Sequence, residues 1–210
     1  GNIAKAAGID SHDVMKIFFE DTKLNLSSYY LKPGFAFGGS CLPKDVRALT
    51  YEARRMDLDL PLLSSIMPSN QRQIQRAVEM VQRKQCRRIG ILGFSFKAGT
   101  DDLRESPVVA LIESLIGKGF DISIYDQNVN LAKLMGSNRE YILEQIPHIS
   151  RLMVDTMEEV VEHAQLLVIG NKAKEFEEFL SCVPEGVMVL DLVRISEEVQ
   201  DRENYDGVCW

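Results

Sequence analysis

The spacing of apolar residues along the chain changes near residue 86. Up to about residue 84, apolar side chains recur every three or four positions, as they do on one face of a helix. Beyond that point, short apolar runs of strand length alternate with amphipathic helical segments. Such alternation is typical of a parallel sheet with helices on both faces. The pattern therefore predicts an α/β protein in which a helical region over residues 1–84 precedes a Rossmann-like domain over residues 86–210.

The helical region is expected to hold four helices and one long loop. The helices are predicted over residues 1–8, from a cap at Asp10 or Ser11, over 43–56 and over 60–84. Pro68 is expected to kink or divide the last helix, because proline cannot donate a backbone hydrogen bond. Residues 24–40 form a loop that is rich in aromatic residues and glycine.

The second region is expected to hold five strands. They are predicted over residues 89–92, 122–125, 152–154, 166–169 and 188–190, with helices near 107–117, 139–146, 156–163 and 173–181.

Composition narrows the classes of function. The 210 residues are 45% hydrophobic and 26% charged, as in an ordinary globular protein. A net charge of −7 argues against unspecific binding to nucleic acid or to anionic membranes, and no apolar run is long enough to span a bilayer. The four cysteines lie far apart, without a Cys-x-x-Cys pair. We therefore expect reduced thiols in the cytoplasm and no metal site.

Residues 37–45, Phe-Gly-Gly-Ser-Cys-Leu-Pro-Lys-Asp, have the composition of a site for covalent catalysis. Pro43 suits the first turn of a helix, which places Cys41 at the helix N-terminus, where peptide dipoles favour a thiolate. Lys44 and Asp45 are spaced so that they can face the same side as this thiol. The alternative is an inert, buried cysteine ahead of an ordinary helix start.

Two glycines precede this thiol. Gly38 and Gly39 allow the backbone to pass close to another group or to adopt a positive φ angle. We therefore expect a close contact at this point of the loop.

A second candidate segment follows the first predicted strand of the α/β domain. Lys97 and Arg104 fall at the carboxyl edge of the sheet, where open α/β sheets bind ligands, and they suit a phosphate or a hydroxyl-rich ligand. The alternative is that both are solvated and paired with Asp101 and Asp102. Asp126 ends the second strand, and we expect it to cap a turn because no glycine-rich loop precedes it.

Two long runs resemble the UDP-glucose/GDP-mannose dehydrogenase family. They are Tyr-Tyr-Leu-Lys-Pro-Gly-Phe-Ala-Phe-Gly-Gly-Ser-Cys-Leu-Pro-Lys-Asp over residues 29–45 and Gly-Phe-Ser-Phe-Lys-Ala-Gly-Thr-Asp-Asp-Leu-Arg-Glu-Ser-Pro over residues 93–107. The first run and the terminal Cys209-Trp210 look most like the GDP-mannose 6-dehydrogenase branch, which supplies mannuronate for polysaccharides of the alginate type. UDP-glucose or a UDP-hexosamine remains the alternative substrate.

The resemblance implies an NAD-dependent enzyme that oxidises an alcohol to an acid in two hydride transfers, here GDP-mannose to GDP-mannuronate. The Cys41 thiolate would attack the intermediate aldehyde to form a thiohemiacetal, whose oxidation gives a thioester that water cleaves. Lys44 would hold NAD or stabilise developing negative charge, and Asp45 would orient or deprotonate water.

The resemblance also assigns binding residues. It carries six residues to the substrate, partly across a subunit boundary: Tyr29, Tyr30, Lys32, Phe35, Gly38 and Lys97. It carries Arg104, with Lys44, to the NAD phosphates. Lys32 departs from the branch, which prefers arginine there. Lysine keeps the charge but loses the planar fork, so its contact to phosphate or guanine should be weaker or differently placed.

The chain matches only about the C-terminal half of the family's length. The N-terminal domain with its Gly-x-Gly-x-x-Gly loop is missing, and Gly90-x-x-Gly93 lacks the necessary spacing. We therefore expect the chain alone to be inactive. The apolar stripes of residues 1–84 exceed what one helical layer can bury, and together with the resemblance they imply a homodimer. The alternative is a binding or dimerisation module without chemistry. His12, His148 and His163 show no partner pattern and are expected to be surface or core histidines.

Overall fold

The computed structural model describes residues 1–25, 27–28, 32–129, 136–147, 149–196 and 203–210. Tyr29, Tyr30 and His148, which the sequence singled out, lie outside the described residues.

Four helices form the first region, and they are α1 (Asn2–Ala6), α2 (Ser11–Phe18), α3 (Leu42–Arg55) and α4 (Pro61–Arg83). The predicted cap of the second helix is confirmed, because the Asp10 carboxylate accepts a hydrogen bond from the backbone N–H of His12 at 2.8 Å. The predicted division at Pro68 is wrong, since α4 continues through it. Pro68 and Ser64 are exposed, so water can reach the carbonyl that the proline leaves without a donor.

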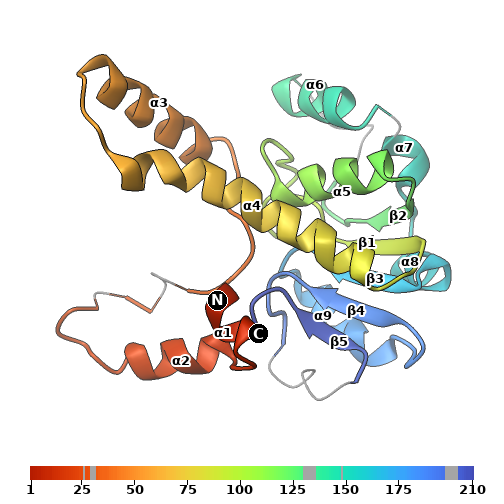
Figure 1. Ribbon diagram of the computed structural model, residues 1–210. Coiled ribbons are helices and arrows are strands. Elements are labelled where there is room, and N and C mark those ends of the chain that lie inside the picture. The colour runs from red at the N-terminus through yellow and green to blue at the C-terminus, as the bar shows by residue number, and fades with distance from the viewer. Residues whose placement is uncertain (26, 29–31, 130–135, 148, 197–202) are drawn as a thin grey trace.

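The helical region forms two arms that leave the sheet on the same side (Figure 1). One arm is made of α3 and the first half of α4, and the other is made of α1, α2 and the loop that follows them. The second half of α4 runs back along the α/β domain, where Ile74, Val78 and Val81 are buried. The helix α4 is therefore shared by the arm and the core.

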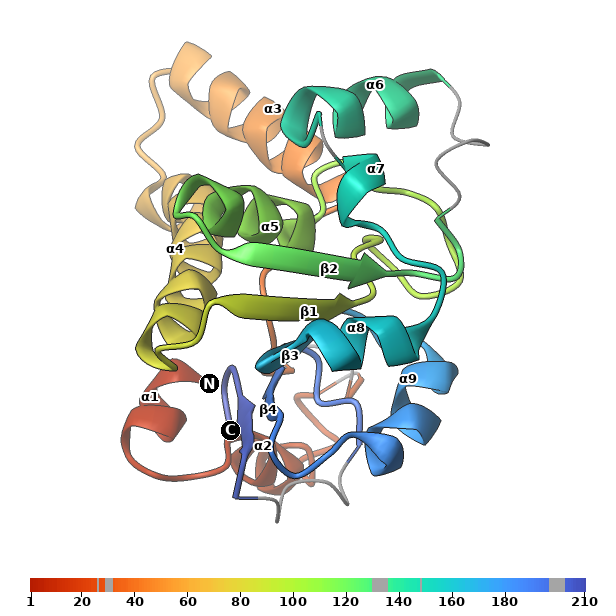
Figure 2. The same ribbon diagram turned by 90° about the vertical axis from the view of Figure 1, so that its right-hand side faces the viewer.

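The second region is a parallel five-stranded sheet, which confirms the predicted fold class. Its strands are β1 (Arg88–Leu92), β2 (Asp121–Tyr125), β3 (Leu166–Ile169), β4 (Met188–Asp191) and β5 (Tyr205–Gly207), in the order β2-β1-β3-β4-β5. The arrows of β1 and β2 point the same way in Figure 2. The helices are α5 (Pro107–Gly117), α6 (Gly136–Gln145), α7 (Ile149–Leu152), α8 (Met157–His163) and α9 (Lys174–Phe179), with a 3₁₀ turn η1 (Leu180–Cys182).

One predicted strand is wrong. Residues 149–152 form the helix α7, and only Met153 pairs with the sheet, through a single parallel bridge to Ile124. The strand β2 lies at the edge of the sheet, and the segment after α7 pairs with it only through this bridge. The sequence also gave no sign of β5, whose residues Tyr-Asp-Gly are too few and too polar to form an apolar run.

Helices cover both faces of the sheet. Buried residues of α4 and α5, such as Val78 and Ile112, share one core cluster with Ile89 and Ile91 of β1. Residues of α8 and α9, such as Val160, belong to a second cluster. The strand β1 can approach α8 closely because its central residue is Gly90, where a Cβ atom would lie 2.6 Å from Val160.

The final residues of the chain lie between the helical region and the sheet, beside the start of the chain (Figure 1). The Lys5 ammonium donates to Asp206 at 2.7 Å and to the Trp210 carbonyl at 2.6 Å. The Ser11 hydroxyl donates to the Cys209 carbonyl at 2.7 Å. These contacts tie α1 and α2 to the strand β5.

Candidate functional site

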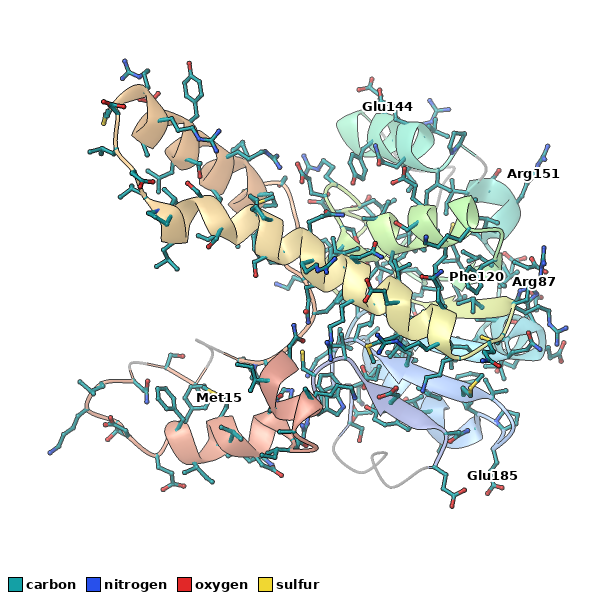
Figure 3. All side chains as sticks on the ribbon, viewed as in Figure 1. Met15, Arg87, Phe120, Glu144, Arg151 and Glu185 are labelled. Carbon is teal, nitrogen blue, oxygen red and sulfur yellow. The ribbon has the colours of Figure 1, made fainter. Side chains whose placement is uncertain are left out.

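A pocket with a volume of about 520 Å³ opens at the carboxyl edge of the sheet. Its wall combines the ends of β1, β3 and β4 with residues 32–36 of the helical region. The charged residues that line it within the described part of the chain are Lys32, Lys97 and Lys172, and no aspartate or glutamate lines it. We call it the basic pocket. Arg87 and Phe120, which precede β1 and β2, mark the opposite edge of the sheet (Figure 3).

Glycines bring the ends of β1 and β3 together beneath this pocket. Gly93 has a φ angle of +79°, and a Cβ atom there would lie 2.6 Å from the Asn171 side chain. A Cβ atom at Gly170 would overlap the carbonyl oxygen of Gly93. Asn171 donates to the Ser95 hydroxyl at 3.0 Å and accepts from the Ala173 N–H at 3.1 Å. The pocket floor is therefore a set of close-packed backbone turns.

Asp126 fixes the loop after β1 through hydrogen bonds to its backbone. Its carboxylate accepts hydrogen bonds from the backbone N–H groups of Phe94 and Ser95, both at 3.0 Å, and from that of Asn128 at 3.1 Å. The side chain is buried among these donors. This confirms that Asp126 caps turns.

The helical side of the pocket is fixed by α4. The Asn70 amide donates to the Phe37 carbonyl at 2.8 Å and accepts from the Phe37 N–H at 2.9 Å. Gln73 donates to the Gly34 carbonyl at 3.0 Å. These bonds hold residues 32–36 against the basic pocket, so the structure brings together three of the predicted substrate residues, Lys32, Phe35 and Lys97.

Gly38, another predicted substrate residue, does not line this pocket. A Cβ atom there would overlap the Glu105 carbonyl and lie 2.7 Å from Pro107. Gly39 has a φ angle of +85°, and its Cβ atom would lie 2.6 Å from the Phe96 ring. The expected close contact is confirmed, and it joins the Cys41 loop to the segment after β1.

Cys41 lies at the N-cap position of α3, as predicted, with Pro43 in the first turn. The thiol is exposed, so the alternative of a buried cysteine is wrong, and it lies 3.8 Å from the Ser40 hydroxyl. The Lys44 ammonium and the Asp45 carboxylate are 3.8 Å apart, with side chains 67% and 68% exposed. All three predicted catalytic groups thus lie on the open side of the loop, and they do not line the basic pocket.

Arg104 faces this loop from the α/β domain. Its guanidinium donates to both carboxylate oxygens of Asp102 at 2.9 Å, as the alternative for this segment anticipated. These hydrogen bonds, and to a smaller extent the Cys41 thiol, hold the pKa of Arg104 above its usual range. A cation therefore lies within electrostatic reach of Cys41.

A second link between the two regions has no counterpart in any sequence motif. Arg47 on α3 donates to Glu105 through both terminal nitrogens, one of them at 3.2 Å, and this bond raises the pKa of Arg47. Glu105 has a φ angle of +52°, which is unusual for a residue other than glycine. Arg47 and Glu105 thus clamp α3 to the segment that carries Arg104.

Two ionisable residues of the pocket wall were not predicted as site residues. Lys172 follows β3, where the sequence shows no motif. His12 is only 8% exposed and packs edge-on against Trp210, with ring centroids 5.1 Å apart. Burial, followed by the charge of Arg194, lowers the pKa of His12 to about 4. His12 was expected to be a surface or core histidine, and it is a buried residue at the pocket.

Two further features are absent from the described residues. No helix there is both long and apolar enough to cross a bilayer. No group of three or more histidine, cysteine, aspartate or glutamate side chains gathers there in an arrangement that could bind a metal ion.

Comparison with known proteins gives two family matches in chain order. Residues 1–72 match the central domain of the UDP-glucose/GDP-mannose dehydrogenase family, and residues 90–198 match the UDP binding domain of the same family. The second match includes most of the wall of the basic pocket.

Individual relatives agree with these matches. A GDP-mannose 6-dehydrogenase from Pseudomonas aeruginosa is 50% identical over 210 residues, which is 100% of this chain and 48% of the relative. The crystal structure of a ternary complex of GDP-mannose dehydrogenase from that organism superposes with a TM-score of 0.80, at 50% identity, over 100% of this chain and 48% of that one.

A UDP-glucose dehydrogenase from Pyrobaculum islandicum shares the fold, with a TM-score of 0.79 at 22% identity over 99% of this chain and 45% of that one. The chain therefore spans about half the length of the relatives it matches. It belongs to the UDP-glucose/GDP-mannose dehydrogenase family.

Proposed function

We propose that this chain is the substrate-binding and thiol-bearing part of an NAD-dependent GDP-mannose 6-dehydrogenase. The observation that carries the proposal is the basic pocket. A chain with a net charge of −7 gathers three lysines and no carboxylate around one cavity at the carboxyl edge of its sheet. Such a cavity suits an anionic ligand, and a volume of about 520 Å³ falls in the usual range for small-molecule sites.

GDP-mannose is favoured as the substrate because GDP-mannose 6-dehydrogenases are 50% identical to the whole chain. In this proposal Lys32 and Lys97 hold the phosphates and sugar hydroxyls, and the Phe35 ring offers an apolar face. Gly38 acts through the close backbone contact that it permits. Tyr29 and Tyr30 are proposed as further substrate residues, although they lie outside the described residues. UDP-glucose and UDP-hexosamines are the alternative substrates.

The proposed reaction proceeds through Cys41. Its thiolate adds to the carbonyl carbon of the aldehyde, and the thiohemiacetal is oxidised to a thioester, which water cleaves to the acid and the free thiol. Asp45 orients or deprotonates that water, and Lys44 and Arg104 supply positive charge near the thiol. NAD, when bound, is the oxidant of both oxidation steps.

The α/β domain of this chain does not fit a dinucleotide site of its own. It lacks a Gly-x-Gly-x-x-Gly loop, and the acid that ends β2, Asp126, is occupied by three backbone N–H groups. We therefore propose that another domain of the enzyme binds NAD, with Lys44 and Arg104 reaching the cofactor from this chain.

A homodimer is the proposed assembly. Four apolar side chains on the two arms are more than three-quarters exposed, namely Ile3, Ile17, Leu24 and Leu62. Exposed apolar surface of this kind is typical of an interface. Light scattering at tens of micromolar should give the mass of a dimer, and Leu62→Glu should weaken it while Ile116→Glu, on α5, should not. A monomer of the unmodified chain at that concentration would contradict the proposal.

The function is tested by joining the chain to a dinucleotide-binding domain of a relative and following NADH at 340 nm. GDP-mannose should be oxidised with a kcat/KM at least tenfold above that for UDP-glucose. The chain alone should produce no NADH, because it lacks a dinucleotide loop. Equal or better use of UDP-glucose would overturn the substrate assignment.

The alternative function, a binding module without chemistry, makes a different prediction. A module of this kind needs the basic pocket but not the thiol. Binding of GDP-mannose without any oxidation by the joined protein would favour the module over the enzyme.

A further inference from the structure

Lys172 is the one charged residue of the pocket wall to which the family motifs assign no role. It lies in the turn after β3, three residues beyond Ile169, and contacts of Gly170 and Asn171 fix this turn. Gly170 packs against the Gly93 carbonyl, and Asn171 bonds to Ser95 and to the backbone of Ala173. The backbone of Lys172 is therefore held at the rim of the basic pocket by the same contacts that build the pocket floor.

The surroundings of Lys172 differ from those of its neighbour Lys174. Within the described part of the chain Lys172 forms no ion pair, whereas Lys174 pairs with Glu178 at 3.2 Å. Desolvation by the surrounding protein, followed by the charge of Lys32, lowers the pKa of Lys172. Among the charged groups that act on Lys172, Lys32 has the largest effect, and Asp191 acts in the opposite direction.

The same two lysines act on His12. Burial and the charge of Arg194 lower the His12 pKa most, Asp10 opposes them, and the charges of Lys32 and Lys172 add to the lowering. All three residues, His12, Lys32 and Lys172, line the basic pocket. An anionic ligand in this pocket would be attracted by both ammonium groups.

We propose that Lys172 is a ligand-binding residue, and that Lys32 and Lys172 together hold the diphosphate of the nucleotide sugar at the basic pocket. The chemistry of two separate ammonium groups fits a diphosphate, which offers oxygens on two phosphorus atoms. A single guanidinium can bridge phosphate oxygens with its planar fork, and two lysines supply the same donors from two segments.

This proposal rests on the proposed function, and binding of GDP to the 210-residue chain tests the two separately. Titration calorimetry would compare the unmodified chain with Lys172→Met, Lys172→Gln, Lys172→Arg and the control Lys174→Met. Both neutral variants should bind GDP about tenfold more weakly. Lys172→Arg should bind within threefold of the unmodified chain, and Lys174→Met should be unchanged. Guanosine, which has no diphosphate, should bind all five proteins equally.

The pH dependence gives a second measurement. The charged groups that act on Lys172 are Lys32, Arg194, Asp191 and Glu177. An anion binds more tightly to the charged form of lysine than to the neutral form. The affinity for GDP should therefore fall as pH rises toward the lowered Lys172 pKa, and this fall should be absent in Lys172→Met. Unchanged GDP affinity in both folded neutral variants would overturn the role of Lys172 and leave the pocket standing. No GDP binding by the unmodified chain would overturn both proposals.

Discussion

The basic pocket and the Cys41 loop both contact the segment after β1, and they differ in how far the protein encloses them. The pocket has a closed floor, in which Ser95 and Ser106 are each 1% exposed and Asn171 is 4% exposed. The Cys41 loop has its close contacts at Gly38 and Gly39, while the thiol and the side chains of Lys44 and Asp45 at the start of α3 are exposed.

This difference indicates that ligand binding and thiol chemistry, which an enzyme active site must combine, depend on different parts of the chain. A floor of buried turns can hold a ligand in one orientation without help from another domain. An exposed thiol at the start of a helix is accessible, but it has few groups around it that exclude water. We therefore assign binding to contacts within this chain, and we assign the completion of the reaction site to the part of the enzyme that carries NAD.

The largest expected effect comes from removing the thiol. In the joined enzyme, Cys41→Ser should lower kcat by about a thousandfold or more, because no thioester can form. GDP affinity should stay within twofold, because Cys41 does not line the pocket. The control is Cys182→Ser, which changes an exposed cysteine elsewhere. A large loss of GDP affinity in Cys41→Ser would contradict the assignment of ligand binding to the basic pocket alone.

The second effect concerns the stability of the pocket wall in acid. The folded-state pKa of His12 is about 4 and its ordinary value is 6.5, so the unfolded chain binds more protons between these values. Neutral, buried His12 contributes about 3 kcal/mol to the free energy of unfolding. This contribution is complete above pH 6.5 and is lost as pH falls toward 4.

Urea denaturation at pH 7.5, 6 and 4.5 measures this loss. In His12→Phe, which keeps an aromatic ring beside Trp210, the decrease should be much smaller. In His163→Gln, which changes a histidine at the end of α8, it should persist. An equal decrease in His12→Phe and the unmodified chain would show that the carboxylates alone cause it.

The third effect lies in substrate binding. Lys32→Ala should raise the KM for GDP-mannose about tenfold and leave kcat within twofold, as expected when an interaction is equally strong in the ground state and the transition state. Lys23→Ala, an exposed lysine on the same arm, is the matched control. A fall in kcat with an unchanged KM would place Lys32 in the chemistry and not in binding.

The smallest effect distinguishes two similar thiols. Cys41 and Cys182 are both exposed, and each lies within 4 Å of the hydroxyl of the preceding serine, at 3.8 and 3.9 Å. Cys41 differs by its place at a helix N-terminus and by the nearby Arg104. Iodoacetamide at pH 7 should therefore label Cys41 several-fold faster than Cys182, and both before Cys86 and Cys209. Equal rates at the two exposed thiols would argue against activation.

The same measurement tests the clamp between the regions. Arg47→Glu should slow labelling of Cys41 two- to fivefold, because an exposed ion pair contributes up to about 1 kcal/mol. Adding Glu105→Arg restores the pair with the charges exchanged, so it should recover part of the rate. Arg55→Glu removes a pair on α3 that does not contact the α/β domain, so its rate should be unchanged.

The sequence predicted the features that depend on nearby residues. The glycine pair before Cys41, the helix start at Pro43 and the parallel sheet all follow from local spacing. It did not predict which distant segments meet, such as Arg47 with Glu105 or Lys172 and Lys32 in the wall of one pocket, because no local pattern records this. The strand β5 was missed for a related reason, since its three residues become a strand only beside β4.

The contacts between the two ends of the chain have a consequence for the order of folding. Lys5 and Ser11 bond to residues 198 to 205 positions later, at Asp206, Cys209 and Trp210. During synthesis on the ribosome, α1 and α2 therefore emerge long before residues 206–210 do, and the side chains of Lys5 and Ser11 stay in water until then. Docking of α1 and α2 onto β5 is thus a late event in the folding of these two regions.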